Sequence, residues 1–294
     1  MKAIFPAGAL LAPILLAACT VTLDSQSQIA RDEKRFTVSG TPNLHLTTFD
    51  GAIEIQSWDK PDVLVEVEKR GSTREAVEAL EVKSSQDGNR IEVEVKKPEG
   101  MSLNGFGFHR SASAKLIVSV PRTADIQARS GDGSIRIAHV TGRTDLHTGD
   151  GSIRAEDVSG ELTLTTGDGS VTVDGAEGRL ALETGDGSVN VSGKLGGVRL
   201  HTGDGSIVYR AQPGVAMADD WDITTGDGSV SLYLPSDFGA ELDAHTGDGS
   251  IRNDLKVDGD RPETNHRTVK GRIGTGGKEL RIRTGDGAIR LRPL

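Results

Sequence analysis

Cysteine and aromatic residues are scarce in this chain. Its 294 residues include one Cys, two Trp, two Tyr and six Phe, but 38 Gly. A single thiol excludes an intramolecular disulfide. So few large rings beside so many glycines argue against a thick core filled by Phe, Tyr and Trp. The sequence therefore predicts a thin interior.

An excess of positive charge and a long apolar run are also lacking. Lys and Arg total 34 against 43 Asp and Glu, which gives a net charge of −9. This balance disfavours nucleic acid and anionic membrane surfaces as partners. The apolar run over residues 3–16 is shorter than the roughly 20 residues that a transmembrane helix needs. We therefore expect that the mature protein does not span a membrane.

The N-terminus has the pattern of an export signal. Lys2 precedes the apolar run, and small residues lead to Cys19, so residues 1–18 are predicted to be a signal peptide. Cys19 could be a chance thiol inside a cleaved leader. Its context Leu-Ala-Ala-Cys, however, resembles the bacterial lipobox, which implies cleavage before Cys19 and lipid on its sulfur. Thr20 in place of Asp implies sorting to the outer membrane, with the protein facing the periplasm or the surface.

A Gly-Asp-Gly repeat dominates the rest of the chain. Its first five copies are separated by a constant 18 residues, and most copies read Thr-Gly-Asp-Gly-Ser. A looser copy begins at Phe49. The Asp of each full copy stands at Asp132, Asp150, Asp168, Asp186, Asp204, Asp227, Asp248 and Asp286. Repetition at a fixed period is the signature of a solenoid or another repeat architecture.

Aligning the copies on Asp separates inward from outward positions, because strand side chains alternate with period two. Apolar residues stand three positions after Asp and four positions before it. These rows include Ile135, Ile153, Val171, Val189 and Ile207, and Leu146, Leu164, Leu182 and Leu200. Polar residues stand between them, at Arg136, Arg154, Thr172, Asn190, Arg129, His147, Thr165, Glu183 and His201. One face of each strand is therefore predicted to be buried and the other exposed.

Each repeat reads as strand, Gly-Asp-Gly turn, strand and a second glycine-containing turn. Stacked coils of this kind hydrogen-bond to their neighbours at about 4.8 Å. An antiparallel sandwich of hairpins is the competing architecture, but it does not require identical residues at a fixed period. We therefore predict an all-β protein, a parallel β-solenoid (β-helix) of 18-residue two-strand coils with one short helix in its N-terminal part.

The predicted domains follow from these patterns. Residues 19–38 are polar and read as a lipidated tether. Residues 39–125 form an N-terminal β region and cap, in which Ser72-Thr73-Arg74-Glu75 has capping-box form and predicts a short helix. Residues 126–294 form the solenoid. Longer spacings after Asp204 predict inserted loops around Pro213, Pro235 and Pro262, which are either tolerated surface excursions or a binding face.

A family resemblance rests on these motifs. The Thr-Gly-Asp-Gly-Ser-Ile copies, the Phe-Asp-Gly-Ala-Ile-Glu-Ile segment from Phe49 and the Leu-Ile-Val-Ser-Val-Pro segment over residues 116–121 resemble the bacterial "putative adhesin" family of β-helical envelope domains. The resemblance covers residues 40–294. It implies a fold and no catalytic residues.

The aspartate ladder is the one constellation that could carry chemistry. In a structural role, each Asp accepts a bond from a turn amide and Gly supplies a positive φ, so that Asp168→Ala would destabilise the turn. In a functional role, Asp132, Asp150, Asp168, Asp186 and Asp204 bind Ca²⁺, which takes six to eight oxygens. The second turn lacks the Asp of a calcium β-roll, so we favour the structural role and expect no cofactor.

Other chemistry finds little support in the sequence. His147 and His201 are three coils apart, which is too far to share a zinc ion. Gly-Asp-Gly lacks the features of a nucleotide-binding loop. The favoured function is a noncatalytic, lipid-anchored envelope protein, an adhesin-like scaffold that contacts envelope proteins or glycans. The alternatives are a polysaccharide-active β-helix enzyme and a divalent-cation-binding module.

Overall fold

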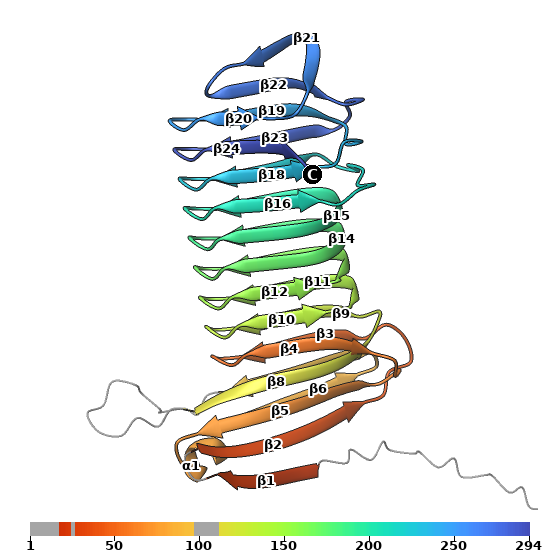
Figure 1. Cartoon of the computed structure of the whole chain (residues 1–294). Helices are drawn as coiled ribbons and strands as arrows, with labels where there is room; N and C mark the ends of the chain where they lie inside the picture. Colours follow the sequence, from red (N-terminus) through yellow and green to blue (C-terminus); the bar gives the residue numbers. More distant parts are fainter. Residues whose placement is uncertain (1–17, 25–26, 97–111) are drawn as a thin grey trace, which may run out of the picture.

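The computed structural model describes residues 18–24, 27–96 and 112–294, which form an elongated stack of strands (Figure 1). The N-terminal strands are β1 (Ala18–Asp24), β2 (Ser27–Phe36), β3 (Asn43–Thr48), β4 (Ile53–Trp58), β5 (Val63–Gly71), β6 (Glu81–Asp87), β7 (Arg90–Lys96) and β8 (Ala112–Pro121). The helix α1 (Arg74–Glu78) lies between β5 and β6. No helix within these ranges has the length and apolar character needed to cross a bilayer.

The remaining strands build the body of the stack. They are β9 (Asp125–Ser130), β10 (Ile135–Ala138), β11 (Thr141–Thr148), β12 (Ile153–Glu156), β13 (Ser159–Thr166), β14 (Val171–Thr184), β15 (Val189–Thr202), β16 (Ile207–Ala211), β17 (Trp221–Thr225), β18 (Val230–Leu234), β19 (Ala240–Thr246), β20 (Ile251–Asn253), β21 (Val257–Thr264), β22 (Thr268–Ile273), β23 (Glu279–Thr284) and β24 (Ile289–Pro293).

The strands pair in two ladders that form the two broad faces of the stack. One ladder runs β1-β2-β5-β8-β4-β10-β12-β14-β15-β16-β18-β24-β20. The other runs β6-β7-β3-β9-β11-β13-β14-β15-β17-β23-β19-β22-β21. All pairs in the middle of the stack are parallel, and β14 and β15 bend to serve both ladders. The prediction of an all-β, solenoid-like fold is confirmed.

Equivalent residues of neighbouring coils lie side by side. Ile135 pairs with Ile153, which pairs with Val171 and so on to Ile207. On the other face Leu146 pairs with Leu164, followed by Leu182 and Leu200. All these side chains are buried, so the interior is a set of aliphatic rows, as expected from the period-two pattern.

Two coils have a place in the stack that does not follow their order in the sequence. The coil of β3 and β4 lies between that of β7 and β8 and that of β9 and β10. At the other end, the coil of β23 and β24 lies between that of β17 and β18 and that of β19 and β20 (Figure 1). The last Gly-Asp-Gly copy in the sequence, around Asp286, is therefore stacked between those of Asp227 and Asp248.

The two ends of the stack are closed by antiparallel strands. Residues 27–36, assigned to the tether from their polar composition, instead form β2, which pairs with β5 and buries Phe36. Around Pro262 the chain forms the β21–β22 hairpin rather than a loop. The predicted helix is present as α1, but its N-cap is Thr73, one residue later than the Ser72 of the capping-box pattern; the Thr73 Oγ1 accepts from the Ala76 amide at 3.2 Å.

The glycines of the two turns are needed for different reasons. In the Gly-Asp-Gly turn, a Cβ on Gly151 would lie 2.3 Å from the Gly133 carbonyl oxygen of the neighbouring coil. None of these glycines has φ in the left-handed region, so the expectation that they supply positive φ is wrong. Positive φ instead occurs in the second turn, for example 115° at Gly160 and 114° at Gly178. Close stacking, not turn geometry, excludes a side chain from the Gly-Asp-Gly turn.

Three of the large rings gather where the coils lengthen. Tyr209, Trp221 and Phe238 are fully buried, and their ring centroids are 5.2 Å apart in successive pairs. Phe238 belongs to the insertion around Pro235. The wider coils of this region thus hold a small aromatic cluster that the regular coils have no room for.

Candidate functional site

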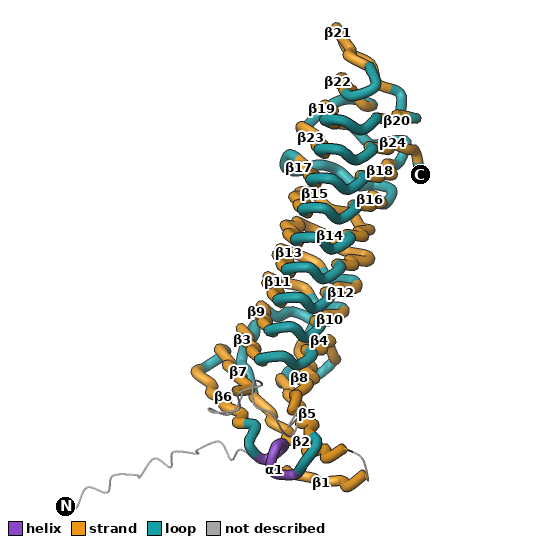
Figure 2. Tube along the Cα trace, turned by 90° about the vertical axis from the view of Figure 1, so that its left-hand side faces the viewer, coloured by secondary structure: helices purple, strands orange, loops and turns teal. Residues whose placement is uncertain are grey.

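The aspartate ladder lies along one narrow edge of the stack. Figure 2 is viewed onto this edge, where the Gly-Asp-Gly turns form a column of loops between the two ladders of paired strands. The five candidate calcium ligands Asp132, Asp150, Asp168, Asp186 and Asp204 all stand exposed on this column. In the described part of the chain, no three His, Cys, Asp or Glu side chains lie close enough together to hold a metal ion. The carboxylates therefore form a row along the stack and do not surround a common metal position.

The turns are joined by threonine, not by aspartate. Thr166 Oγ1 donates to the carbonyl oxygens of Gly151 at 2.8 Å and Gly149 at 3.1 Å in the preceding coil. The same pattern recurs at Thr148, Thr184, Thr202, Thr225, Thr246 and Thr284. Within the described ranges, none of the ladder's aspartates accepts a hydrogen bond from a turn amide. The expected turn contact of Asp168 is therefore wrong, and the buried threonine row provides the bond between coils.

The remaining residues singled out from the sequence do not converge. His147 and His201 are exposed, as is His245, which lies in the same outward row on β19 and whose Nδ1 lies 3.1 Å from Thr268 Oγ1. Cys19 lies in β1, opposite Asp32 of β2 in the antiparallel pairing. These positions assemble no catalytic arrangement.

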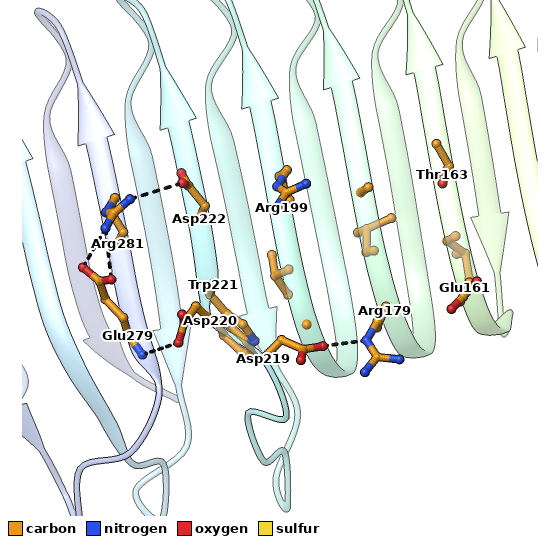
Figure 3. Close-up of a pocket in the computed structure, with 15 residues that line it drawn as sticks. Glu161, Thr163, Arg179, Arg199, Asp219, Asp220, Trp221, Asp222, Glu279 and Arg281 are labelled. Carbon is orange, nitrogen blue, oxygen red and sulfur yellow. Dashed lines mark hydrogen bonds and ion pairs between the residues drawn. The ribbon is translucent and has the colours of Figure 1, made fainter.

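A shallow groove of about 510 Å³ crosses the outer surface of β13, β14, β15, β17 and β23 (Figure 3). Its floor is an in-register row of outward side chains, one from each strand. The row reads Thr163, Ala181, Arg199, Asp222 and Arg281. The small side chains of Thr163 and Ala181 leave the hollow, and charged side chains surround it.

The insertion around Pro213 forms one wall of the groove. The amides of Ala218 and Asp219 both donate to the Gly196 carbonyl oxygen, at 2.7 and 3.0 Å, which folds the insertion back against β15. At Gly197, an added Cβ would lie 3.1 Å from Asp219 Oδ2, so a glycine permits this close approach. Asp219 Oδ2 in turn receives a hydrogen bond from Arg179 Nε at 2.5 Å. The insertion therefore packs against β15 and forms part of the groove lining.

Most charged side chains of the groove are already paired. The hydrogen bond from Arg179 lowers the pKa of Asp219, with the charge of Arg179 acting in the same direction. At the opposite end Arg281 pairs with Glu279 at 3.0 Å and approaches Asp222 at 4.0 Å. Arg199 differs, because no carboxylate within the described ranges pairs with it. Among the residues that the structure describes, Arg199 is thus the groove arginine without a carboxylate partner, whereas Arg179 and Arg281 are ion-paired.

Sequence reasoning did not single out the groove residues. Arg199 occupies an ordinary outward strand position, and nothing in the repeat distinguishes it. The available signal was the longer spacing after Asp204, which locates the insertion but does not indicate where it folds. The groove depends on which strands the insertion lies against.

These features define a parallel β-solenoid domain with an open, largely ion-paired groove on one broad face. Residues 42–292 match the model of the family described as Toastrack DUF4097, and the chain belongs to this family. The match confirms the relationship that the Gly-Asp-Gly copies indicated. No curated protein matches the chain.

Several solved structures resemble the chain at low identity. A "putative cell adhesion protein" from Clostridium sporogenes is 16% identical, with a TM-score of 0.28, over 90% of this chain and 100% of that one. A "putative adhesin" from Bacteroides fragilis is 10% identical, with a TM-score of 0.38, over 89% and 96%. A "putative lipid binding protein" from Parabacteroides distasonis is 12% identical, with a TM-score of 0.46, over 89% and 96%.

Proposed function

We propose that this chain is a noncatalytic, lipid-anchored protein of the cell envelope that presents its solenoid as an elongated binding scaffold. In this proposal the 18-residue two-strand coil is the unit from which the surface is built. Envelope proteins or glycans are the partners, and the groove around Arg199 is the contact site.

The state of the groove carboxylates carries this proposal. A glycoside-cleaving pair needs one carboxylic acid whose pKa is raised, so that it can donate a proton. In the groove, Asp219 has a lowered pKa because Arg179 binds it, and Glu279 and Asp222 face Arg281. A carboxylate that a guanidinium holds as an ion, as Arg179 holds Asp219, binds and orients polar groups but is a poor proton donor. The arrangement therefore supports binding over catalysis.

The anchor is proposed to be lipid on Cys19, with the protein sorted to the outer membrane. Its position in the fold is compatible with this role, because β1 lies at one end of the stack (Figure 1). An anchor at that end leaves both broad faces and the groove accessible along the length of the molecule.

A binding screen tests the proposed function. The purified full chain, in detergent, would be applied to arrays of envelope glycans and to immobilised envelope proteins. We expect at least one ligand to bind without being changed, and Arg199→Gln to weaken that binding about tenfold, the loss of about 1.4 kcal/mol. The control Arg129→Gln removes an exposed guanidinium from β9, away from the groove. Release of shortened glycan products would contradict the noncatalytic assignment. Equal binding by Arg199→Gln and the wild type would show that the groove is not the contact site.

A further inference from the structure

A second charged surface lies on the other broad face, over β16, β18, β24 and β20. We name it the arginine patch; its residues are Arg210, Tyr233, Arg252, Arg290 and Arg292. Register brings them together from distant parts of the sequence, because Arg290 lies opposite Arg252, and Tyr233 lies between Arg210 and Arg292. The four strands are neighbours in the stack (Figure 1).

The patch differs in charge from the row of side chains that crosses the groove. There, the outward row alternates in sign through Arg199, Asp222, Arg281 and Asp243. In the patch, two arginines stand directly opposite each other at Arg290 and Arg252. Like charges at opposed positions destabilise a sheet, and this occurs in a chain whose net charge is −9. An in-register arginine pair also occurs at Arg136 and Arg154. What sets the patch apart is that four guanidiniums gather over neighbouring strands in a chain of this net negative charge.

The guanidiniums of the patch are only partly neutralised. Asp254 is the carboxylate that reaches them, at 3.5 Å from Arg252 and 3.9 Å from Arg292. Arg210 is held over the ring of Tyr233, 5.0 Å from its centroid, a cation–π contact that keeps the positive charge available. Arg290 has no carboxylate partner in the described part of the chain. Four positive charges therefore face one negative charge, and three of the guanidiniums have a neighbour that positions them.

We propose that the arginine patch binds an acidic polysaccharide through its carboxylates. Guanidinium groups bind carboxylates with paired, directional hydrogen bonds. Three of the four neighbouring strands, β16, β24 and β20, carry the patch arginines, so the guanidiniums follow one another along the stack axis with Tyr233 of β18 between them. This linear arrangement suits an extended polymer with repeated negative charges. A membrane surface is a poorer fit, because the net charge of −9 disfavours approach to an anionic bilayer, and no large hydrophobic side chain of the patch is exposed for insertion; Leu294 is the one such residue in the described ranges.

Binding of the full chain to immobilised polygalacturonate tests the proposal, with the fully methyl-esterified polymer as the uncharged match. We expect binding to polygalacturonate alone, weakened by added NaCl because salt screens the charges. The double variant Arg252→Gln/Arg290→Gln should lose about tenfold or more in affinity. Arg129→Gln, which removes an arginine from the opposite face, and the groove variant Arg199→Gln should both bind as the wild type does.

Thermal unfolding of the same variants separates binding from stability. Because the double variant relieves the repulsion between opposed arginines, it should melt no lower than the wild type. A lower melting temperature would show that the arginines serve the fold, and would overturn the proposal. Equal binding of the esterified polymer, unchanged affinity of the double variant, or capture by phosphatidylglycerol vesicles without capture by polygalacturonate would also overturn it. Loss of binding in the double variant alone supports the patch even if Arg199 proves to have no role.

Discussion

At the scale of single residues, the repeat shows that a recurring residue need not be the one that makes the contact. Thr and Asp recur together in the Gly-Asp-Gly copies, and both are residue types whose side chains commonly bond to turn backbones. In the structure the threonine hydroxyls are buried and donate to the carbonyls of the neighbouring coil, whereas the aspartates are exposed. The difference follows from strand alternation, which points the Thr position inward.

A matched pair of variants in one turn tests this division. Thr166→Val removes a buried hydroxyl that bonds to two carbonyl oxygens, and should cost about 1–3 kcal/mol of unfolding free energy, because a buried acceptor is left unsatisfied. Asp168→Ala changes an exposed side chain and should cost less than about 0.5 kcal/mol. Urea unfolding of the two variants measures this loss. A larger loss of unfolding free energy for Asp168→Ala than for Thr166→Val would show that aspartate makes the turn contact.

A second pair tests the assignment of inside and outside. Leu164 is fully buried in the aliphatic row, and Thr165 next to it points outward. Leu164→Asp should unfold the array or cost several kcal/mol, because it buries an unpaired charge. Thr165→Asp should change stability by less than about 0.5 kcal/mol. Calorimetry should show well-separated melting temperatures, and equal shifts for the two variants would contradict the inward direction of this row.

At the scale of elements, charge pairs connect the strands that close the N-terminal end. Glu68 of β5 is 5% exposed and lies opposite Arg31 of β2. Its carboxylate accepts from Arg31 at 2.8 Å and from Arg70 at 2.6 Å. Burial alone would raise the pKa of Glu68, but the hydrogen bonds and charges of Arg31 and Arg70 outweigh it, so the pKa is lowered. The ionised form of Glu68 therefore stabilises the β2–β5 pairing.

This pairing has a defined pH dependence. The folded-state pKa of Glu68 lies below its unfolded value of about 4.3, so its stabilisation is complete above that value and is lost as the pH falls through the folded-state pKa. At pH 7, Glu68→Gln should cost about 1–2 kcal/mol, the effect of weakened charged hydrogen bonds. Unfolding free energies of wild type and variant should converge below about pH 4. A difference that stays constant down to pH 3 would contradict an ionic role.

At the scale of the whole molecule, the chain is a stack whose ends are built differently from its middle. The middle adds one coil after another in sequence order. At the N-terminal end the chain adds the coil of β7 and β8 on the outer side of β3 and β4 and then continues with β9 and β10 on their inner side. At the C-terminal end it forms β19 to β22 and then returns to place β23 and β24 one coil further in. The caps cover strand edges that would otherwise pair with other chains, and the last coil in the sequence is held between two others.

Anchoring is tested on the exported protein. Mass spectrometry of the mature N-terminus should find cleavage between Ala18 and Cys19 and lipid on Cys19, as its lipobox-like context predicts. Cys19→Ser should remove the lipid mass and release the protein from the membrane fraction, because the acyl chains supply the anchoring energy. An unmodified Cys19, or a leader cut elsewhere, would exclude this form of attachment.

Much of the fold could be predicted from the sequence because its signal is local and periodic. Alternation around Leu164 or Ile153 defines the buried face within a few residues, and a fixed period requires equivalent residues to stack. The same approach failed for residues 27–36, because their polar composition predicted a tether. β2 is an edge-region strand with one side facing water, and its pairing with β5 is set by the antiparallel cap and not by any repeat.

The sequence by itself determined the thin aliphatic interior, the glycine-rich turns and the stacking of equivalent positions, because each depends on spacing along the chain. Only the tertiary structure decided the order of the end coils, the fold of the insertion around Pro213 over β15, and the gathering of Arg210, Arg252 and Arg290 on one face. Those features depend on contacts between segments far apart in the sequence. Local spacing carries no information about which distant strand becomes the neighbour.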